Sequence, residues 1–592
     1  MNNPSFLYGR VTFLLTLKVA FLLLLTSCKK SGSDSKIEEP YVAKNETVIV
    51  FPLDAIEDIE PVDQNSGSGE LKSSGSSREQ LKKVTVQSEI VSLGDVDAVM
   101  TISEELPTSY QKEKRIISTS SNRTSSAGGN RAAGTATDLA PGTTYRVVLY
   151  TADASGNQVT YVGQAEGKVG TAAISIPANR NTKYRWYAYT NNNTSPIPAF
   201  NQATSTVPLD PTGNNPSTRK DFAYATGIIT TNNIKDGQNL INGIVLARKT
   251  SRIIVEVNSR GLFAPITHAN VKFKDNSGVV SGNFRLSDGT LQSINPLVAS
   301  KNVYVHHNAA YQVPLDVDTV LDVNTKRRYT FYTPTNGTTS RKLVVSIDTL
   351  KVTSQRLADT DGSIGYVERQ FYGKTFEFPT FVAMPGKSYF VSIKLVESAI
   401  TIGTTKWARG NTWRDANGKL TPEGLWQYKM RYDNPLYKTT AGVPTTDYFT
   451  SDVYSIGSGG KNLCELIYPE GTWDLPTQAQ VDEIRSFQGK NIGTEGSNWY
   501  MYIIPTTTAE GYPGHPHGNL IFTPVGYKTS STGSPIDFYP NSTFWYTRTK
   551  GYWRTKTANV FAVLSYTFTQ SSMINNQSMT SSRLASVRCV RK

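Results

Sequence analysis

Short runs of alternating apolar and polar residues, separated by turn-forming clusters, dominate the first 400 residues of this 592-residue chain. Lys183–Thr190 (KYRWYAYT) is the clearest run, because Tyr184, Trp186 and Ala188 fall on one side of it. A spacing of two residues is typical of a β-strand. No long stretch with helical spacing occurs before residue 400. Short strands separated by frequent turn clusters therefore predict β-sandwiches.

The remaining strand candidates divide into two blocks. Pro141–Val147 and Pro385–Val391 share a pattern, in which a Pro-Gly turn and a hydroxyl residue lead into Tyr and a strand. This repeat fits two related sandwiches in tandem. A stretch rich in Asn, Thr and Pro, 191–216, predicts the boundary, so we expect a first sandwich at 45–215 and a second at 216–400. Further strands are expected at Thr47–Leu53, Val84–Val91, Tyr145–Tyr150, Val159–Gly163, Ser251–Val257 and Leu343–Val352.

The last block, 401–592, has a different character. Thr477–Gln488 is the best helix candidate in the chain, because Thr477 and Gln480 form a capping-box pattern. Val481, Ile484 and Phe487 then recur at three-residue spacing. Seven of the eight tryptophans also lie in this block. We expect a mixed α+β domain here, after two mainly β domains.

The N-terminal residues 1–27 have the features of a secretory signal, with Arg10 before an apolar run that ends in Leu-Thr-Ser directly before Cys28. This ending resembles a bacterial lipobox, which implies lipidation and cleavage at Cys28, and several acyl chains make a lasting membrane anchor. The alternative is a plain signal or a membrane anchor with an incidental cysteine. Residues 28–44 are polar and predict a tether.

Charge and cysteine content narrow the functions further. The formal charge is +13, but the densest basic cluster is Lys326–Arg328, so a solvated basic surface is favoured over nucleic-acid binding. If Cys28 carries lipid, Cys464 and Cys589 remain, and outside the cytoplasm two such cysteines are expected to pair. That bond would close a loop of about 125 residues and add about 4–5 kcal/mol of stability. Two buried free thiols are the alternative.

The lipobox, the strand-rich blocks and two segments, Gly142–Tyr150 and Tyr184–Asn191, together resemble the fimbrillin-like surface proteins of Bacteroidetes. The resemblance implies a pilus subunit or tip adhesin on the outer membrane, with other fimbrial subunits as partners. It also implies assembly by strand donation, in which an early strand is removed and a neighbour's strand replaces it. Thr47–Leu53 is then the candidate strand, and Arg78 and Arg115 are the candidate cleavage sites.

The C-terminal block resembles the Fibrobacter succinogenes major-paralogue domain. Its motifs are an early Cys464, the segment Trp473–Thr477, the ending Ala585–Arg591 and the lead-in Lys406–Asn411. One departure is Asp474, where a basic residue is more usual, and it puts a local ion pair in doubt. The resemblance implies a C-type-lectin-like fold held by a disulfide.

Catalytic and metal-binding motifs are missing from the sequence. There is no His-Glu-x-x-His, Walker A or Gly-x-Ser-x-Gly pattern, and Gly457–Lys461 has the wrong spacing for a phosphate loop. His515 and His517 could supply two metal ligands but lack an obvious third. We therefore expect a protein that is not an enzyme and that needs no cofactor or metal.

Aromatic residues of the last block are the candidate ligand contacts, since flat rings with a polar edge suit sugars and proteins. Most of them are expected in the core. Those near loop-like sequence are Trp499, Tyr500, Tyr512, Trp545 and Trp553. The sequence thus predicts a surface adhesin that binds a protein or glycan of a host or bacterial surface. The alternative is a stand-alone glycan-binding lipoprotein of a polysaccharide uptake system.

Overall fold

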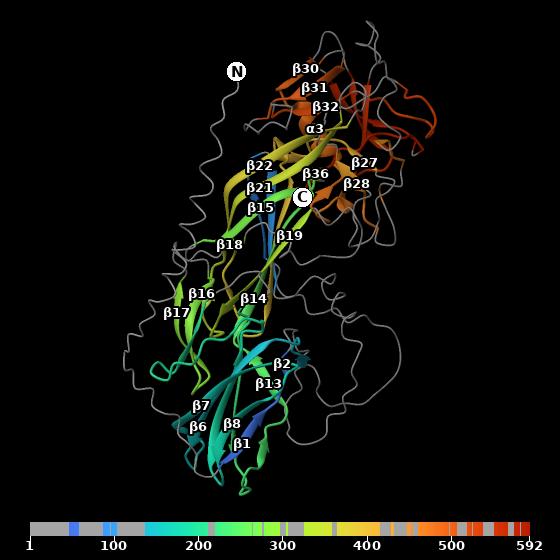
Figure 1. Ribbon diagram of the computed structural model, residues 1–592. Helices are drawn as coiled ribbons and strands as arrows, with labels where there is room; N and C mark the ends of the chain where they lie inside the picture. Colours follow the sequence, from blue (N-terminus) through green and yellow to red (C-terminus); the bar gives the residue numbers. More distant parts are fainter. Residues whose placement is uncertain are drawn as a thin grey trace, which may run out of the picture. The chain divides into compact units, whose positions relative to one another are not determined.

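The computed structural model describes most of the chain after residue 45 (Figure 1). All described residues belong to one compact unit, Asn45–Lys592. Among these residues, no helix is long and apolar enough to cross a membrane. Strands dominate, as the alternation predicts. The described ranges are 46–57, 87–94, 96–103, 136–210, 220–262, 264–274, 278–296, 304–305, 325–357, 364–414, 428–430, 447–450, 454, 460–495, 498–505, 518–523, 525–536, 550–565, 573–580 and 582–592.

The first sandwich consists of a seven-stranded and a three-stranded sheet. Their shared core includes Ile49, Phe51, Val147, Leu149 and Trp186, none more than 7% exposed. The larger sheet has the order β5 (Ala136–Asp138), β2 (Leu53–Glu57), β13 (Ile244–Arg248), β11 (Ala223–Thr230), β9 (Lys183–Thr190), β6 (Thr144–Ala152) and β7 (Gln158–Lys168). The smaller has the order β12 (Gln238–Leu240), β1 (Glu46–Phe51) and β8 (Ile174–Asn179).

The second face of the seven-stranded sheet is also covered. Tyr187 and Tyr189, on the opposite side of β9 from Trp186, are 1% exposed and pack with Phe284 and Leu286 in an aromatic cluster. Phe284 belongs to a small sheet of β10 (Thr206–Leu209), β16 (Val280–Arg285) and β17 (Thr290–Pro296). Both sides of β9 are therefore buried, which explains why both carry apolar or aromatic residues.

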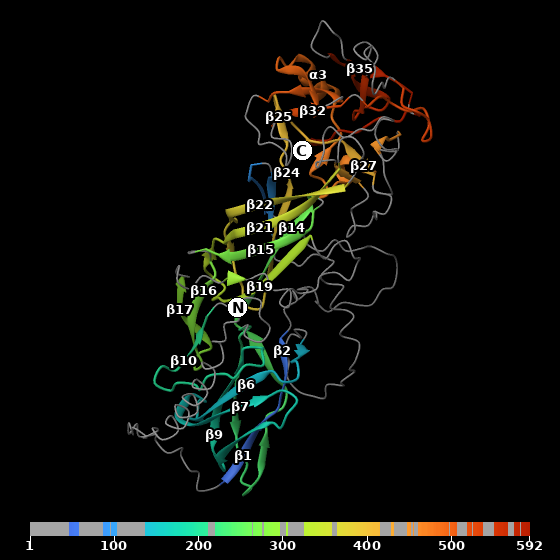
Figure 2. The ribbon, with the colours of Figure 1, turned by 45° about the horizontal axis from the view of Figure 1, so that its top comes forward.

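The second sandwich packs a five-stranded sheet on a four-stranded one (Figure 2). Val255, Ile347, Val391 and their neighbours form its core and are almost completely buried. The five-stranded order is β19 (Lys326–Pro334), β14 (Thr250–Gly261), β24 (Ser388–Glu397), β4 (Val96–Ser103) and β3 (Gln87–Ser92). The four-stranded order is β18 (Tyr304–Val305), β15 (Ile266–Phe273), β21 (Val344–Leu357) and β22 (Ile364–Glu377), with the pair β20 (Ser340–Arg341) and β23 (Phe381–Val382) nearby in sequence.

The sheets do not follow the linear division at residue 215. Strands β3 and β4, which precede that point, pair within the second sandwich, whereas β11, β12 and β13, which follow it, belong to the first. The reason is visible in β4, where Val96, Ala98, Met100 and Ile102 alternate and fill the core of the second sandwich. The chain therefore contributes to both sandwiches before it completes either one.

The C-terminal block is mixed α and β, as expected. Its described helix α3 (Gln478–Ser486) begins after the Thr477 cap, and the Thr477–Gln480 capping box is present. Val481 and Ile484 form the apolar side of α3, and both are buried in the core of this block. The strands are β25 (Ile400–Ile402), β26 (Thr405–Trp407), β27 (Thr412–Arg414), β28 (Tyr428–Met430), β29 (Trp473–Asp474), β30 (Lys490–Glu495), β31 (Asn498–Ile503), β32 (Leu520–Phe522), β33 (Lys550–Arg554), β34 (Val560–Ser565), β35 (Met573–Ser578) and β36 (Val590–Arg591).

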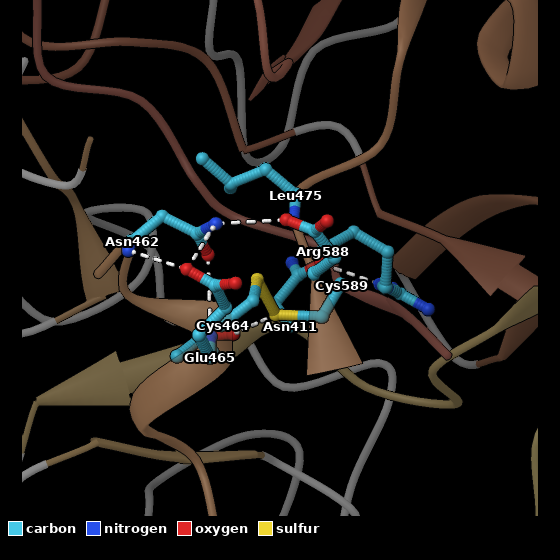
Figure 3. The surroundings of a disulfide bond; sticks show 9 residues. Asn411, Asn462, Cys464, Glu465, Leu475, Arg588 and Cys589 are labelled. Atoms are coloured by element: carbon cyan, nitrogen blue, oxygen red, sulfur yellow. Dashed lines mark hydrogen bonds between the residues drawn. A yellow bond between two sulfur atoms is a disulfide. The ribbon is translucent and has the colours of Figure 1, made fainter. Parts of the chain in front are cut away.

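A disulfide joins Cys464 to Cys589, as the cysteine count led us to expect (Figure 3). Both cysteines are fully buried. Next to Cys589, the buried guanidinium of Arg588 donates to Asn411 Oδ1 at 2.8 Å and to the carbonyl oxygens of Arg409 at 2.7 Å and Ile521 at 2.8 Å. Strand β36 pairs with β26 and β29, so the last strand ties the start of this block to the disulfide region.

Asp474, the departure from the family pattern, has its own partners. Its carboxylate accepts from Asn462 Nδ2 at 2.7 Å and from the Leu475 N–H at 2.8 Å. Lys556 Nζ lies 2.6 Å from the other oxygen. Asp474 is therefore paired with a lysine from a different segment of the chain.

Candidate functional site

Strand β1 contains most of the segment that the sequence marks as the removable strand. It lies between two partners rather than at a sheet edge. On one side it pairs antiparallel with β8, from Glu46 opposite Asn179 to Phe51 opposite Ile174. On the other side it runs parallel to β12, with Val48 opposite Gln238. The first described strand of the chain is thus inserted between strands that come much later in sequence.

Polar groups fasten the start of β1 to the segment around β12. The Thr47 hydroxyl donates to the Gly237 carbonyl at 2.6 Å and accepts from Asn239 Nδ2 at 2.8 Å. The Val48 N–H donates to the same Gly237 carbonyl at 3.0 Å, and Tyr145 Oη donates to the Phe51 carbonyl at 3.1 Å. These bonds fix the register of β1, on which the burial of its apolar side chains depends.

After Pro52 the chain crosses to the other sheet. There β2 pairs parallel with β13 and antiparallel with β5. Ile49 and Phe51 of β1 and Leu53 and Ile56 of β2 enter one core and are at most 3% exposed. The Phe51 ring meets Trp186 edge-on at 6.1 Å. Twelve consecutive residues, 46–57, therefore supply a strand to each sheet of the first sandwich.

Loss of this segment would open the first sandwich on both sides. Burial of one large apolar side chain contributes about 1.5–3 kcal/mol, so the four residues together contribute about 6–12 kcal/mol. That is comparable to the whole stability of a typical domain. The unpaired edges of β8, β12, β13 and β5 would also be exposed. The vacated groove would need a replacement strand with apolar residues at the same spacing.

The predicted cleavage and lipidation residues, Arg78, Arg115 and Cys28, lie outside the described residues. Their places in the sequence still matter, because Arg78 follows β2 and precedes β3, whereas Arg115 follows β4. A cut at Arg78 would release β1 and β2 alone. A cut at Arg115 would release β3 and β4 as well, and with them part of the second core.

The aromatic candidates of the C-terminal block have different outcomes. The expectation that Trp553 is exposed is wrong, since it is 2% exposed and its indole N–H donates to Asn411 Oδ1 at 3.0 Å. Trp553 lies on β33 and packs edge-on against Phe522 at 5.0 Å, which makes it a core residue. Tyr512 and Trp545 lie outside the described residues, and of Trp499 the structure describes the backbone on β31, opposite Thr494.

Tyr500 is half-buried on β31, and sequence reasoning missed its partner, Tyr502. The two rings lie 6.0 Å apart, on the side of the strand opposite to the buried Met501 and Ile503. Gly493 lies beneath Tyr500, and a side chain there would collide with the ring. The alternation in Asn498–Ile503 was the signal that could have identified the pair.

Metal-binding groups do not gather in the described part of the chain, where no cluster of three or more His, Cys, Asp or Glu side chains occurs. The histidine pair considered from sequence, His515 and His517, lies outside it. The described part also contains a cavity of about 580 Å³ between β11 and β13, lined by Trp186, Tyr224, Thr226, Asn242 and Lys249 among others.

No protein-family model and no curated protein matches the chain. Solved structures that it matches include the fimbrilin of Porphyromonas gingivalis, at 12% identity and TM-score 0.22, over 46% of this chain and 95% of that one. The fimbrial anchor protein Mfa2 of the same organism matches at 13% and 0.20, over 35% and 69%. A fimbrial assembly protein of Parabacteroides distasonis matches at 11% and 0.23, over 42% and 82%. Because the TM-scores are this low, these likenesses carry no argument about the function of the chain.

Proposed function

We propose that this chain is a lipid-anchored cell-surface adhesin, and a tip or accessory subunit of a fimbria assembled by strand donation. The observation that carries the proposal is the position of residues 46–57. The first described segment of the chain supplies the middle strand of one sheet and a strand between β5 and β13 in the other, and four of its side chains enter the core. A segment on the N-terminal side of a cleavage site can be released by a single cut, and the groove that it leaves in the sheets then accepts another strand by β-augmentation.

The order of the strands favours Arg78 over Arg115 as the cleavage site. A cut after Arg78 removes strands from the first sandwich alone. A cut after Arg115 also removes β4, which is flanked by β24 and β3 and carries four buried apolar residues. Two sandwiches would then need repair by one incoming strand. The proposal therefore assigns the processing step to the part of the sequence between β2 and β3.

Matched variants test this assignment in cells that assemble the protein on their surface. Arg78→Ala is expected to leave the full-length chain on the surface and to keep it out of the polymer. Arg115→Ala is the control and is expected to be incorporated like wild type. Incorporation of R78A at the wild-type level, measured by immunoblot of sheared fimbriae, would contradict the proposal.

The second candidate is a stand-alone glycan-binding surface lipoprotein of a polysaccharide uptake system. The Tyr500–Tyr502 pair favours it, since these half-buried rings lie on the side of β31 opposite to the core residues Met501 and Ile503, and apolar rings with polar edges suit a sugar. A glycan array separates the two functions. Specific oligosaccharide binding that Y500A/Y502A abolishes, by a chain that never enters a polymer, supports capture rather than assembly.

A further inference from the structure

Polar residues gather on one face of the five-stranded sheet in the second sandwich. Ile253, Val255 and Val257 of β14 point into the apolar core, so the alternate residues point to the other face. There Glu256 is 4% exposed and Asn258 only 1%. On the same face, Arg328 of β19 lies opposite Glu256. Asn258 lies between two lysines, Lys326 of β19 and Lys394 of β24. A carboxylate, a primary amide and amines thus share a nearly dry surface.

The register brings Lys394 next to Asn258. Strands β14 and β24 run parallel, and Asn258 lies directly opposite Lys394, at the last regular pair before a bulge. Residues opposite each other on neighbouring strands have backbones about 5 Å apart and side chains on the same face. The four-carbon stem of lysine spans that gap easily. The amine of Lys394 can therefore approach the side-chain carbonyl carbon of Asn258.

The Asn258 amide is held in one orientation by its hydrogen bonds. Its Oδ1 accepts from the Arg260 N–H at 2.9 Å. Its Nδ2 donates to Glu256 Oε1 at 3.0 Å and to Tyr468 Oη at 2.8 Å. A backbone N–H on the carbonyl oxygen stabilises negative charge that develops there during attack on the carbon. A carboxylate on the amide nitrogen is placed to deliver a proton to it as it leaves.

Ionisation favours the same chemistry. Burial lowers the pKa of Lys394, although the nearby Glu256 opposes this, so the neutral amine is more accessible than for an exposed lysine. Burial also raises the pKa of Glu256, but Arg328 and Lys326 outweigh it and keep the carboxylate ionised. Arg328 Nε holds the second carboxylate oxygen at 2.5 Å, which leaves Oε1 to face Asn258.

We propose that Lys394 and Asn258 join in an intramolecular isopeptide bond, with Glu256 as the catalytic carboxylate. Glu256 takes a proton from the Lys394 ammonium, and the neutral amine attacks Cγ of Asn258. Glu256 passes this proton to Nδ2 and the C–Nδ2 bond breaks. The carboxylate then takes the second proton from the nitrogen that came from Lys394 and gives it to the departing ammonia. One amide forms, one is lost and ammonium leaves, so the step needs no oxidant, reductant or other reactant.

The bond would covalently link β14 to its neighbour β24. Paired residues of these two strands, such as Arg252 and Ser388, are 136 positions apart in sequence. Lys326 is the competing amine, since it lies opposite Asn258 on the antiparallel side. Both lysines lie opposite Asn258, and the proposal assigns the reaction to Lys394 because burial lowers the pKa of that amine, whereas the charge of Lys326 helps to keep Glu256 ionised. This cross-link is independent of strand donation, since β14 and β24 both lie after the proposed cleavage site.

Peptide mass spectrometry of the purified full chain tests the bond directly. Trypsin should release Ile253–Arg260 joined to Ser388–Lys406, with no cleavage after Lys394 and a mass about 17 Da below the sum of the two peptides. Two separate peptides with Lys394 cleaved, or a link from Asn258 to Lys326, would overturn the proposal.

Variants separate the chemistry from the fold. E256Q should fold and lack the cross-link, because Gln keeps the shape but cannot carry the proton. Lys394→Met should also lack it, whereas Lys326→Met should keep it. If E256Q fails to fold, the wild-type peptide map remains decisive. Persistence of the joined peptide in E256Q would remove Glu256 from the reaction and overturn its assigned role.

Discussion

The guanidinium of Arg591, on β36, donates through Nη1 to the carboxylate of Asp97, on β4, 494 positions earlier in the chain. Both side chains are almost completely buried. The same guanidinium donates to the Glu397 carbonyl and lies over the Trp473 ring at 4.7 Å. One arginine thus links the C-terminal block to a strand of the second sandwich.

Removal of either partner should be costly, because the other charge would remain buried without its counter-ion. We expect Arg591→Ala and Asp97→Ala each to lower the free energy of unfolding by about 3–5 kcal/mol. The double variant should lose clearly less than the sum of the two. Urea unfolding of all four proteins checks this. Additive losses would show that the two residues act independently.

The disulfide should contribute through the long loop that it closes. C464S/C589S is expected to lower the unfolding free energy by about 4–5 kcal/mol, since the bond spans 125 residues. Reductant should destabilise the wild type and leave the variant unchanged. Equal denaturation midpoints for the oxidised wild type and the variant would contradict this account.

Glu483 should make the attachment of α3 dependent on pH. Its carboxylate accepts from the Thr404 N–H at 2.6 Å and from the Thr405 hydroxyl at 2.6 Å. Burial raises the pKa of Glu483, but these hydrogen bonds outweigh it and hold the pKa below its ordinary value of about 4.5. The stabilisation is therefore complete above that value and is lost as the pH falls through the lower, folded-state pKa.

Glu483→Gln should cost about 1 kcal/mol at neutral pH and weaken the loss of stability on acidification. Thermal unfolding between about pH 7 and pH 3 measures both effects. The exposed Glu470, paired with Lys461, supplies a control, because E470Q should cost less than about 0.5 kcal/mol. An unchanged pH profile in E483Q would remove Glu483 as the source.

Trp553 and the Tyr500–Tyr502 pair should respond in opposite ways to truncation. W553A should cost about 3–5 kcal/mol, because it leaves a cavity in the core and unpairs Asn411 Oδ1 from one donor. Y500A/Y502A should cost less, because both rings are only half-buried, and should alter ligand binding instead. A Y500A/Y502A protein that binds every glycan or protein ligand like wild type would leave the pair without a binding role.

Local patterns were sufficient to predict individual elements. Lys183–Thr190 is a strand at the predicted bounds, and the Thr477 cap starts α3 where the capping box indicated. Pairing partners could not be predicted in this way. Strand β4 has the same alternation as any half-buried strand, and its place beside β24 depends on contacts with residues almost 300 positions away. Loop-like neighbours likewise gave no indication that Trp553 is buried.

The central claim, that residues 46–57 are exchanged for a donated strand, is tested most directly by the N-terminal sequence of the chain recovered from assembled fimbriae. The account predicts a single start at Glu79, directly after Arg78, with Gln87–Ser103 retained and residues 46–57 absent. A polymer-incorporated chain that still begins at Cys28 and contains Thr47–Leu53 would contradict it.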